Sequence, residues 1–288
     1  MSKFALFHPF VNLIFFVAVI CFSMFVIHPF FVTISVVTAF CYSIIINGLK
    51  SIKFSFKVII PMAIISVLIN ILTNRNGATI ITTLPFDISV SREALIAGIC
   101  TAGVIASAIL WFSCFNAVVT NEKLIYLFGK AMPSLGLILS MVLRFVPTYK
   151  KQFKQTALAQ RSIGFEISNG KLIYRLRNFS KIMSVMTGKV LENSIDTADS
   201  MRGRGYGFKG KTSYNIYKFK KSDFLFVIVT VILTAIILYT GADYSYYPAF
   251  TMQTSPYYGF LSFFMLCIIP IIIEIQEILK WKYLKSKI

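Results

Sequence analysis

Residues 9–46, PFVNLIFFVAVICFSMFVIHPFFVTISVVTAFCYSIII, contain no Asp, Glu, Lys or Arg and are interrupted only by His28-Pro29. A helix that crosses a bilayer needs about 20 consecutive apolar residues. One helix of this length would be too long, and proline commonly marks a turn. The stretch therefore predicts two transmembrane helices joined by a tight turn at His28-Pro29. It is too long for a signal peptide and no small-residue cleavage site follows it, so we expect the first helix to be retained.

The rest of the chain repeats this pattern of apolar blocks separated by basic segments. Of its 288 residues 57% are hydrophobic, and the mean hydropathy is +0.74. Such values are typical of integral membrane proteins. Further spans are predicted at residues 58–72, 94–120, 224–242 and 258–273. We therefore expect an all-α integral membrane protein with about six transmembrane helices.

The formal charge of +18 arises from 29 Lys and Arg against 11 Asp and Glu. Most of this charge falls between the spans, and basic loops of membrane proteins stay on the cytoplasmic side. The charge therefore indicates orientation, and we expect no nucleic-acid partner. With six spans, the basic segments share one face and both termini are cytoplasmic. Residues 241–259 hold no Lys or Arg but five Tyr, which predicts the outer face.

The cysteines and histidines show no spacing typical of a metal or cofactor site. All five cysteines lie in apolar stretches, and no two form a Cys-x-x-Cys pair. They are expected to be small buried hydrophobic residues. His8 and His28 each stand in a His-Pro-Phe sequence at the edge of a span, where a residue at a helix end is the simpler interpretation. No cofactor is therefore predicted.

Residues 144–221 form a basic interval with seventeen Lys and Arg against four Asp and Glu. Apolar residues recur at helical spacing in two parts of it, which predicts two helices that pack through narrow seams. The first seam has Leu139, Val142, Val146, Tyr149, Phe153 and Ala157, and the second has Leu172, Leu176, Phe179, Met183, Met186 and Val190. We expect long amphipathic helices at residues 137–163 and 171–202 on the cytoplasmic face, with Pro147 bending the first. The expected division is residues 1–130, 131–221 and 222–288.

Residues 205–212 match the phosphate-loop pattern, and their glycines also match the dinucleotide fingerprint. Both motifs need a buried strand before the glycines and a helix after them. The residues before Gly205 are polar and helical in character, and those after Thr212 alternate and then enter a span. We expect no ATP binding by this chain itself.

Two other functions stay open as alternatives. Asp196 and Asp199 have the spacing of a Mg²⁺-binding pair, as in membrane prenyltransferases, although such enzymes need a second acidic cluster that this sequence lacks. Carboxylates on a helix surface, paired with Arg202, are the simpler interpretation. A self-contained permease would need polar or charged residues within its spans, and these offer only isolated Asn, Ser and Thr. No catalytic residue is therefore predicted.

The second amphipathic helix ends in the sequence Arg202-Gly203-Arg204-Gly205-Tyr206. Glycine ends a helix and lets the backbone approach a neighbouring surface. The arginines would then stand at the helix end, where a guanidinium can pair with the carboxylates of a partner. Attraction to anionic lipid headgroups is the alternative, and composition alone does not separate the two.

The chain resembles the transmembrane T component of energy-coupling factor transporters, a family that includes cobalt and vitamin uptake systems. The resemblance covers nearly the whole chain and is strongest at residues 159–161, 191–193, 197–201, 204–207 and 212–213 (AQR, LEN, TADSM, RGYG and TS). Family members carry an Ala-Arg-Gly signature at the end of each of two coupling helices. The second signature matches Gly203-Arg204-Gly205, with glycine for alanine. The first falls near Gly164, which puts Ile163 in the arginine position and leaves the charge on Arg161.

The resemblance implies a non-catalytic scaffold in the cell membrane. Its partners would be two cytoplasmic ABC-type ATPase subunits, a membrane-embedded substrate-binding subunit (the S subunit) and the lipid bilayer. The cargo would be a vitamin, a cofactor precursor or a metal ion, chosen by the S subunit. The implied ATPase-docking residues are Arg204, Gly203, Gly205, Arg202, Tyr206, Arg161, Gln160 and Gly164.

Overall fold

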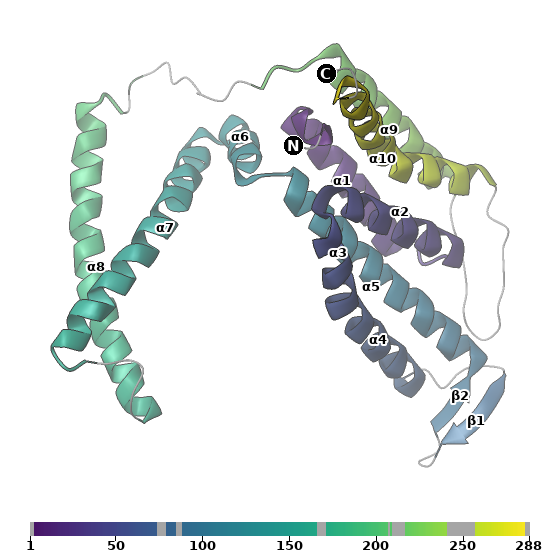
Figure 1. Ribbon diagram of the computed structural model, residues 1–288, viewed down its shortest axis with the longest axis horizontal. Helices are drawn as coiled ribbons and strands as arrows, with labels where there is room; N and C mark the ends of the chain where they lie inside the picture. Colours follow the sequence, from purple (N-terminus) through teal and green to yellow (C-terminus); the bar gives the residue numbers. More distant parts are fainter. Residues whose placement is uncertain are drawn as a thin grey trace. The chain divides into compact units, whose positions relative to one another are not determined.

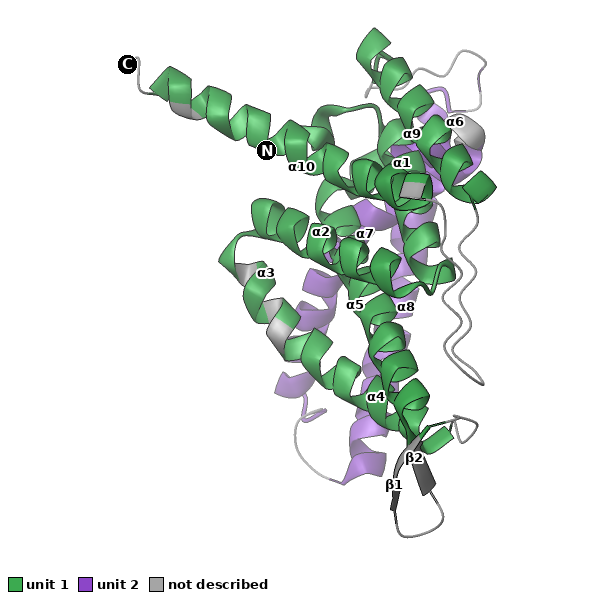
Figure 2. Cartoon of the chain, turned by 90° about the vertical axis from the view of Figure 1, so that its right-hand side faces the viewer, with its two compact units in different colours: residues 1–124, 217–288 green, residues 125–216 purple. Residues whose placement is uncertain are grey.

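The computed structural model describes residues 3–73, 79–84, 88–165, 171–206, 208, 217–240 and 257–285. These residues are almost entirely helical, and several helices are long and apolar enough to cross a membrane, so the predicted fold class is confirmed (Figure 1). The chain divides into two compact units (Figure 2). Unit 1 comprises residues 1–124 and 217–288, and unit 2 comprises residues 125–216.

The turn predicted at His28-Pro29 separates helix α1 (Pro9–Phe25) from helix α2 (Pro29–Asn47). Each helix begins with proline, whose fixed φ suits the first helical position. The preceding histidine caps each helix: Nδ1 of His8 accepts a hydrogen bond from Phe10 N, and Nδ1 of His28 accepts one from Phe30 N, both at 3.3 Å. Burial lowers the pKa of His28, which favours the neutral ring that accepts this bond. The prediction of helix-end histidines is confirmed.

The other predicted spans of unit 1 are also helices, with two differences in length. The span predicted at residues 58–72 begins earlier, so that Lys53 and Lys57 belong to the helix. The span predicted at residues 258–273 continues well past residue 273, so that Lys280 and Lys285 lie on the helix. The hairpin of β1 and β2, antiparallel with an irregularity between Ile80 and Thr82, was not predicted. The elements are the one-turn helix η1 (Phe4–Leu6), α3 (Leu49–Phe54), η2 (Ser55–Ile59), α4 (Ile60–Thr73), β1 (Ile80–Leu84), β2 (Ile88–Ser91), α5 (Arg92–Val118), α9 (Lys221–Thr240) and α10 (Tyr257–Lys285). Helix α6 (Asn121–Ala131) begins in unit 1 and ends in unit 2.

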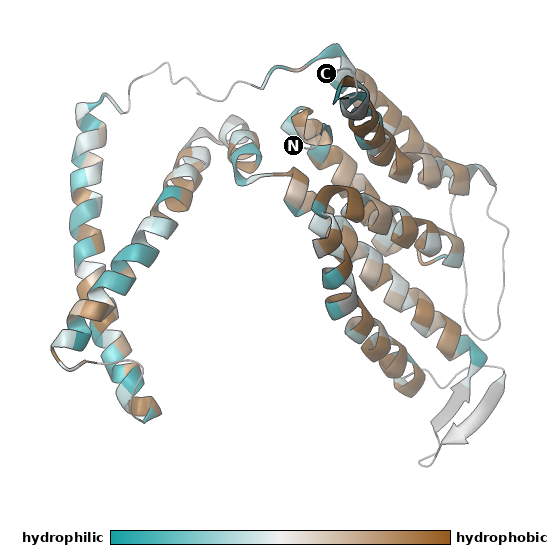
Figure 3. Ribbon diagram, in the orientation of Figure 1, coloured by the Kyte–Doolittle hydropathy of each residue, from teal (hydrophilic) through white to brown (hydrophobic). Residues whose placement is uncertain are grey.

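Five helices in the described part of the chain are long and apolar enough to cross a membrane. They are Pro29–Asn47, Ser51–Thr73, Arg92–Val118, Lys221–Thr240 and Tyr258–Lys285, and a shorter apolar helix covers Pro9–Phe25. Colouring by hydropathy shows α4 and α10 as largely hydrophobic, whereas α7 and α8 of unit 2 carry hydrophilic and hydrophobic patches in turn (Figure 3). The chain is therefore a multi-pass membrane protein. The predicted outer loop includes residues 241–256, which lie outside the described part.

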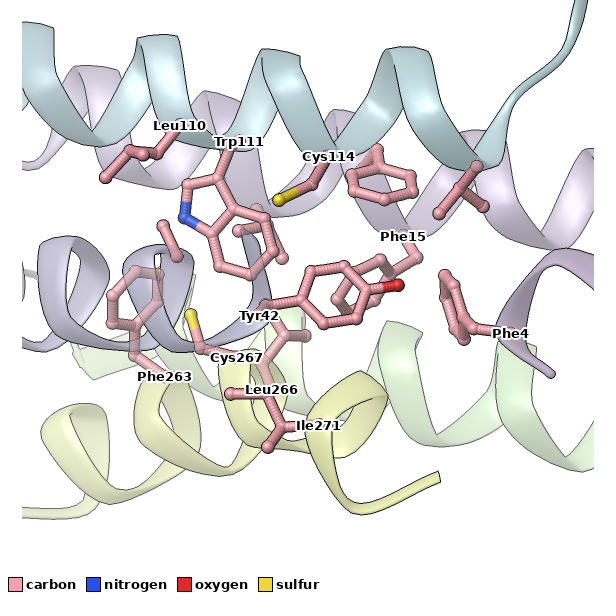
Figure 4. Packing of buried hydrophobic residues seen from close by; sticks show 14 of the residues in the cluster. Phe4, Phe15, Tyr42, Leu110, Trp111, Cys114, Phe263, Leu266, Cys267 and Ile271 are labelled. Carbon is pink, nitrogen blue, oxygen red and sulfur yellow. The ribbon is translucent and has the colours of Figure 1, made fainter. Parts of the chain in front are cut away.

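The core of unit 1 is built from aromatic side chains (Figure 4). Tyr42 lies between Trp111 and Phe4, with ring centroids 6.1 and 6.4 Å from its own. The rings meet edge-on or tilted, as aromatic quadrupoles prefer. The indole Nε1 of Trp111 donates to Ser35 Oγ at 3.1 Å, so this fully buried ring leaves no polar atom without a partner. Close packing of this kind holds helices together where lipid removes the hydrophobic driving force.

The N-terminal turn η1 is held between a buried carboxylate and a buried ammonium group. The Glu274 carboxylate accepts hydrogen bonds from the backbone N–H of Phe4 (3.0 Å) and Lys3 (3.2 Å). At the other end Lys123 Nζ donates to Ala5 O (2.5 Å), as well as to Val118 O (2.9 Å). Negative charge at the N–H end and positive charge at the carbonyl end stabilise a helical turn.

Lys123 differs from what its sequence position suggests. As a lysine of a basic segment between spans it was expected on the cytoplasmic face, but its side chain is buried. With the Asn12 amide turned so that its oxygen faces the lysine, that oxygen also accepts from Nζ at 3.0 Å. Burial lowers the pKa of Lys123 to about 8. Through its bonds to Val118 O and Ala5 O, Lys123 anchors the start of α6 to the end of α5 and to η1. Lys123 and Glu274 also line a cavity of about 700 Å³ in unit 1.

Unit 2 contains the two long helices that the basic interval predicts, α7 (Pro133–Ser162) and α8 (Leu172–Gly203). Helix α7 begins earlier than expected, with a proline in the first turn, and continues as one helix through Pro147. The helices cross near Phe153 and Phe179, whose ring centroids are 6.1 Å apart, and Ile182 is buried there (Figure 1). The packing covers part of the predicted seam, since Leu172 and Leu176 are 74% and 64% exposed.

Candidate functional site: the two helix ends of unit 2

The α7 end, residues 160–165, closes with a hydrogen-bond pattern that ends many helices. Phe165 N donates to Gln160 O at 3.0 Å, and Gly164 N donates to Arg161 O at 3.0 Å. Gly164 has a φ of +91°, in the left-handed region where glycine has no steric cost. This is a Schellman motif, in which a left-handed residue turns the chain away from the helix axis.

The α8 end, residues 201–206, closes in the same way. Tyr206 N donates to Met201 O at 3.0 Å, Gly205 N donates to Arg202 O at 2.9 Å, and Gly205 has a φ of +81°. The two ends therefore present equivalent backbone positions. Counting from the left-handed glycine pairs Gly164 with Gly205, Phe165 with Tyr206, Ile163 with Arg204, Ser162 with Gly203, Arg161 with Arg202, and Gln160 with Met201.

The α8 end offers charge to its surroundings. Arg202, Gly203 and Arg204 are exposed, and Gly205 is half-buried. Tyr206 is 45% exposed, so its ring is also accessible. Asp196 and Asp199 are exposed on the last turns of α8 and form no ion pair with Arg202 in the described part of the chain. Two guanidinium groups thus stand at this end, where they can pair with carboxylates or phosphates.

The α7 end is supported by the neighbouring helix. The Tyr174 hydroxyl donates to Gly164 O at 3.4 Å, and Lys181 Nζ lies 4.0 Å from the centre of the Phe165 ring. A cation over an aromatic face is attracted by the ring quadrupole. Arg161 is exposed and Gln160 half-buried on the last turn. Arg161 is the counterpart of Arg202, and the counterpart of Arg204 is Ile163.

The structure also bears on the phosphate-loop pattern. A phosphate loop follows a strand, but Gly205 follows the long helix α8. Residues 207 and 209–216, which include Lys211 and Thr212, lie outside the described part of the chain. Among the described residues, no group of three or more His, Cys, Asp or Glu side chains is placed to hold a metal ion. The helix before Gly205 therefore does not match the strand that a phosphate loop requires.

The signature in the sequence already paired Ile163 with Arg204, and the shared Schellman motif agrees with that pairing. Sequence reasoning did not predict the motif itself, for which the glycine that follows each helix was a signal. It also missed the burial of Lys123 at the start of α6. No sequence signal marks this lysine, because two of its partners, the Ala5 carbonyl and the Asn12 amide, come from a distant segment.

Comparison with known proteins gives a consistent result. The model of the CbiQ family, described as cobalt transport protein, matches residues 5–214 and so includes both helix ends. The energy-coupling factor transporter transmembrane protein EcfT of Lactobacillus helveticus is 31% identical over 117 residues, which cover 40% of this chain and 42% of the relative. EcfT of Macrococcus caseolyticus is 26% identical over 205 residues, covering 67% and 74%. EcfT of Lactococcus lactis is 30% identical over 105 residues, covering 36% and 40%.

The alignments with the Lactobacillus and Lactococcus relatives span about two fifths of those proteins, whereas the family model spans most of this chain. The multi-pass helical architecture and the pair of long helices fit this assignment. The resemblance found in the sequence is confirmed. The chain belongs to the CbiQ family of cobalt transport proteins and is similar to EcfT, the transmembrane component of energy-coupling factor transporters.

Proposed function

We propose that this chain is the transmembrane scaffold of an energy-coupling factor importer. Two cytoplasmic ABC-type ATPases bind the ends of α7 and α8, and a membrane S subunit binds the apolar faces of the same helices. ATP-driven movement of the ATPases shifts the helices, and the shift moves the S subunit so that its cargo is released inward. The cargo is a vitamin, a cofactor precursor or a metal ion, and the scaffold itself performs no chemistry.

The observation that carries this proposal is the pair of equivalent helix ends in unit 2. Both close with the same Schellman motif, and the α8 end exposes Arg202 and Arg204 beside glycines that have no bulk. A Cβ at Gly203 would meet nothing within 4 Å, so this side of the backbone is open to a partner. Two like ends suit a pair of like partners, as two ATPase subunits are.

The lengths of α7 and α8 support a role in transmitting movement. A helix of 30 residues such as α7 is about 45 Å long. Because the two helices touch mainly where they cross, near Phe153 and Phe179, a displacement at one end moves the far end as well. Hydrogen-bonded helices are stiff over this length, so little of the movement is absorbed within them.

The apolar faces of α7 and α8 support a contact with a hydrophobic partner. Both helices expose large apolar side chains, and cations stand among these side chains along each helix. A helix that faces lipid on all sides does not carry such a mixture. Exposed apolar patches rimmed by polar residues mark interaction sites. The exposed apolar residues are Leu135, Ile138, Val142, Val146 and Leu158 on α7, and Leu172, Ile173, Leu176, Phe179, Val185, Leu191 and Ile195 on α8.

The charge distribution supports a cell-membrane location with the helix ends in the cytoplasm. Seventeen of the 29 basic residues lie in residues 144–221, and positive charge is retained on the cytoplasmic side. The basic residues of α10, including Lys280 and Lys285, would then place the C-terminal end on the same side. Both termini are cytoplasmic in this arrangement.

The docking role of Arg204 is tested by reversing its charge. We expect Arg204→Glu to abolish co-purification of the ATPases with the full-length chain, because a carboxylate would face the carboxylates that Arg204 pairs with. Lys189→Glu is the matched control, since Lys189 is an exposed cation near the middle of α8, away from both helix ends. Membrane insertion should be unchanged in both variants. Normal ATPase recovery with Arg204→Glu would remove the docking assignment.

The absence of chemistry in this chain is tested by ATP hydrolysis. The purified chain alone should release no phosphate from ATP above the background of a mock purification. Addition of the ATPase subunits should restore hydrolysis. Turnover by the chain alone that disappears in Lys211→Ala would instead establish the phosphate loop and contradict the scaffold role.

A further inference from the structure

The α7 end and the α8 end have the same backbone geometry but different side chains. Counting from the left-handed glycine, Ile163 on α7 takes the position of Arg204 on α8. One turn earlier Leu158 takes the position of Asp199, and Gln155 takes that of Asp196. At these three positions the α8 end has charges and the α7 end has none. The partner surface that receives one end at these three positions therefore differs in chemistry from the surface that receives the other.

The apolar side chains of the α7 end are accessible. Ile163 is 68% exposed and Leu158 is 63% exposed. Ala159, also exposed, lies four residues before Ile163 and thus on the same helix face. One exposed isoleucine is ordinary on a protein surface. Ile163, however, occupies the position that Arg204 has at the α8 end.

The α7 end also holds Ile163 in a defined place. The residues that follow it are fixed against α8, because Tyr174 donates to Gly164 O and Lys181 lies over the Phe165 ring. Ile163 N donates to Gln160 O at 3.2 Å, which fixes its own backbone. A side chain that is positioned before binding loses less conformational entropy when a partner covers it. The arrangement suits an anchor that enters a pocket.

We propose that the α7 end docks its ATPase subunit through Ile163, inserted into an apolar pocket, whereas the α8 end docks through the charge of Arg204. This inference rests on the proposed function, since it assigns the chemistry of one of its two docking contacts. The partner is an ATPase surface with an apolar floor and an acidic rim. Arg161 on α7 and Lys181 on α8, which both belong to this end, provide the complementary charge. The two ATPase contacts of one scaffold then differ in kind.

Salt distinguishes the two kinds of contact. The attraction between exposed charges is screened as the Debye length falls from about 10 Å at 0.1 M to about 3 Å at 1 M ionic strength. Burial of an apolar side chain is not weakened by such screening, because it does not depend on charge. The contact at Arg204 should therefore weaken in high salt and the contact at Ile163 should persist.

The test uses the full-length chain in native membranes, co-expressed with each ATPase subunit in turn and purified through a tag on the chain. We expect Ile163→Glu to lower the recovery of one ATPase at least about tenfold, which corresponds to about 1.4 kcal/mol. Ile163→Leu should keep recovery near wild type. Thr187→Glu is the matched control, because it adds a carboxylate at an exposed position of α8 that lies outside the apolar faces and away from both ends. The ATPase lost with Ile163→Glu should be the one that resists a wash at about 1 M salt.

Three results would overturn the inference. Unchanged recovery with Ile163→Glu would mean that this end does not dock. Increased recovery with Ile163→Arg would mean that the pocket is acidic and that the α7 end is a weakened copy of the α8 end. Loss of both ATPases from the wild type in high salt would mean that both contacts are ionic. A wild-type chain that recovers no ATPase at low salt would contradict the proposed function itself, which separates the two failures.

Discussion

Unit 1 and unit 2 differ in how far they bury their apolar side chains. Unit 1 buries a cluster of aromatic and aliphatic residues around Trp111 and Tyr42, in which the Trp111 indole donates to Ser35 Oγ. Among the described residues of unit 2, Ile182 is the one hydrophobic side chain that is fully buried. Unit 1 is thus packed by its own residues, whereas unit 2 leaves large apolar side chains exposed on both of its long helices.

Exposure alone does not make this distinction, because unit 1 also exposes apolar residues. On α4, Ile64, Leu68 and Leu72 are all about half exposed. Between residues 60 and 73 that helix carries no charged residue, as a surface in contact with lipid requires. On α8, cations such as Arg175, Arg177 and Lys181 stand among the exposed apolar residues. The mixed surface fits a protein partner, and the uniform surface fits lipid.

The largest effect should follow from opening the core of unit 1. Trp111→Ala should destabilise the chain by about 3–5 kcal/mol, because it leaves a cavity and deprives Ser35 Oγ of its partner. Phe112→Ala is the control, since Phe112 is the next residue on α5 and is 48% exposed. Thermal unfolding in detergent should show a much lower midpoint for the first variant. Equal midpoints would contradict the view that unit 1 is held by its own core.

A smaller loss should follow from removing the carboxylate that holds η1. Glu274→Ala leaves the backbone N–H groups of Lys3 and Phe4 without their acceptor, at a cost of about 1–3 kcal/mol for a buried unpaired group. Glu277→Ala is the matched control, because its ion pair with Lys3 at 2.9 Å is partly exposed and such pairs contribute little to stability. Limited proteolysis of the N-terminus should be faster in Glu274→Ala only. Similar proteolysis of both variants would remove the assigned role of Glu274.

In unit 2 the same kind of truncation should cost less. Phe179→Ala removes the aromatic contact with Phe153 at the helix crossing, where such a pair contributes about 0.5–1.5 kcal/mol. Amide hydrogen exchange in α7 and α8 should become faster, while exchange in α5 stays as in the wild type. Faster exchange throughout α5 as well would show that the two units are not independently stabilised.

The last prediction concerns pH and Lys123. Its pKa of about 8 in the folded chain lies below the ordinary value of 10.5, so the unfolded chain binds more protons between these two pH values. Stability rises with pH wherever the unfolded state binds more protons. This lysine should therefore make the folded state more stable as pH rises from about 8 toward about 10.5, and less stable below that window. Comparison of unfolding midpoints between wild type and Lys123→Met should show this slope only in the wild type. A parallel pH dependence in both would contradict it.

The sequence was most informative where one local property decides the structure. Charge-free runs of sufficient length identify helices that cross a membrane, because lipid leaves the backbone no other way to satisfy its hydrogen bonds. The two His-Pro-Phe sequences likewise identified helix starts, since capping involves neighbours only two residues apart. The apolar period of the basic interval identified α7 and α8. For the candidate site, the glycines after each helix identified where the two ends lie.

The sequence by itself thus determined the class of this protein, the positions of its long helices and the residues at their ends. Only the tertiary structure decided that Lys123 is a buried anchor, that Glu274 holds η1, and that α7 and α8 cross near Phe153 and Phe179. It also showed that the ends carrying Ile163 and Arg204 close with the same Schellman motif. The reason is that helices and their caps depend on interactions within a few residues, whereas burial and partner geometry depend on segments far apart in the chain.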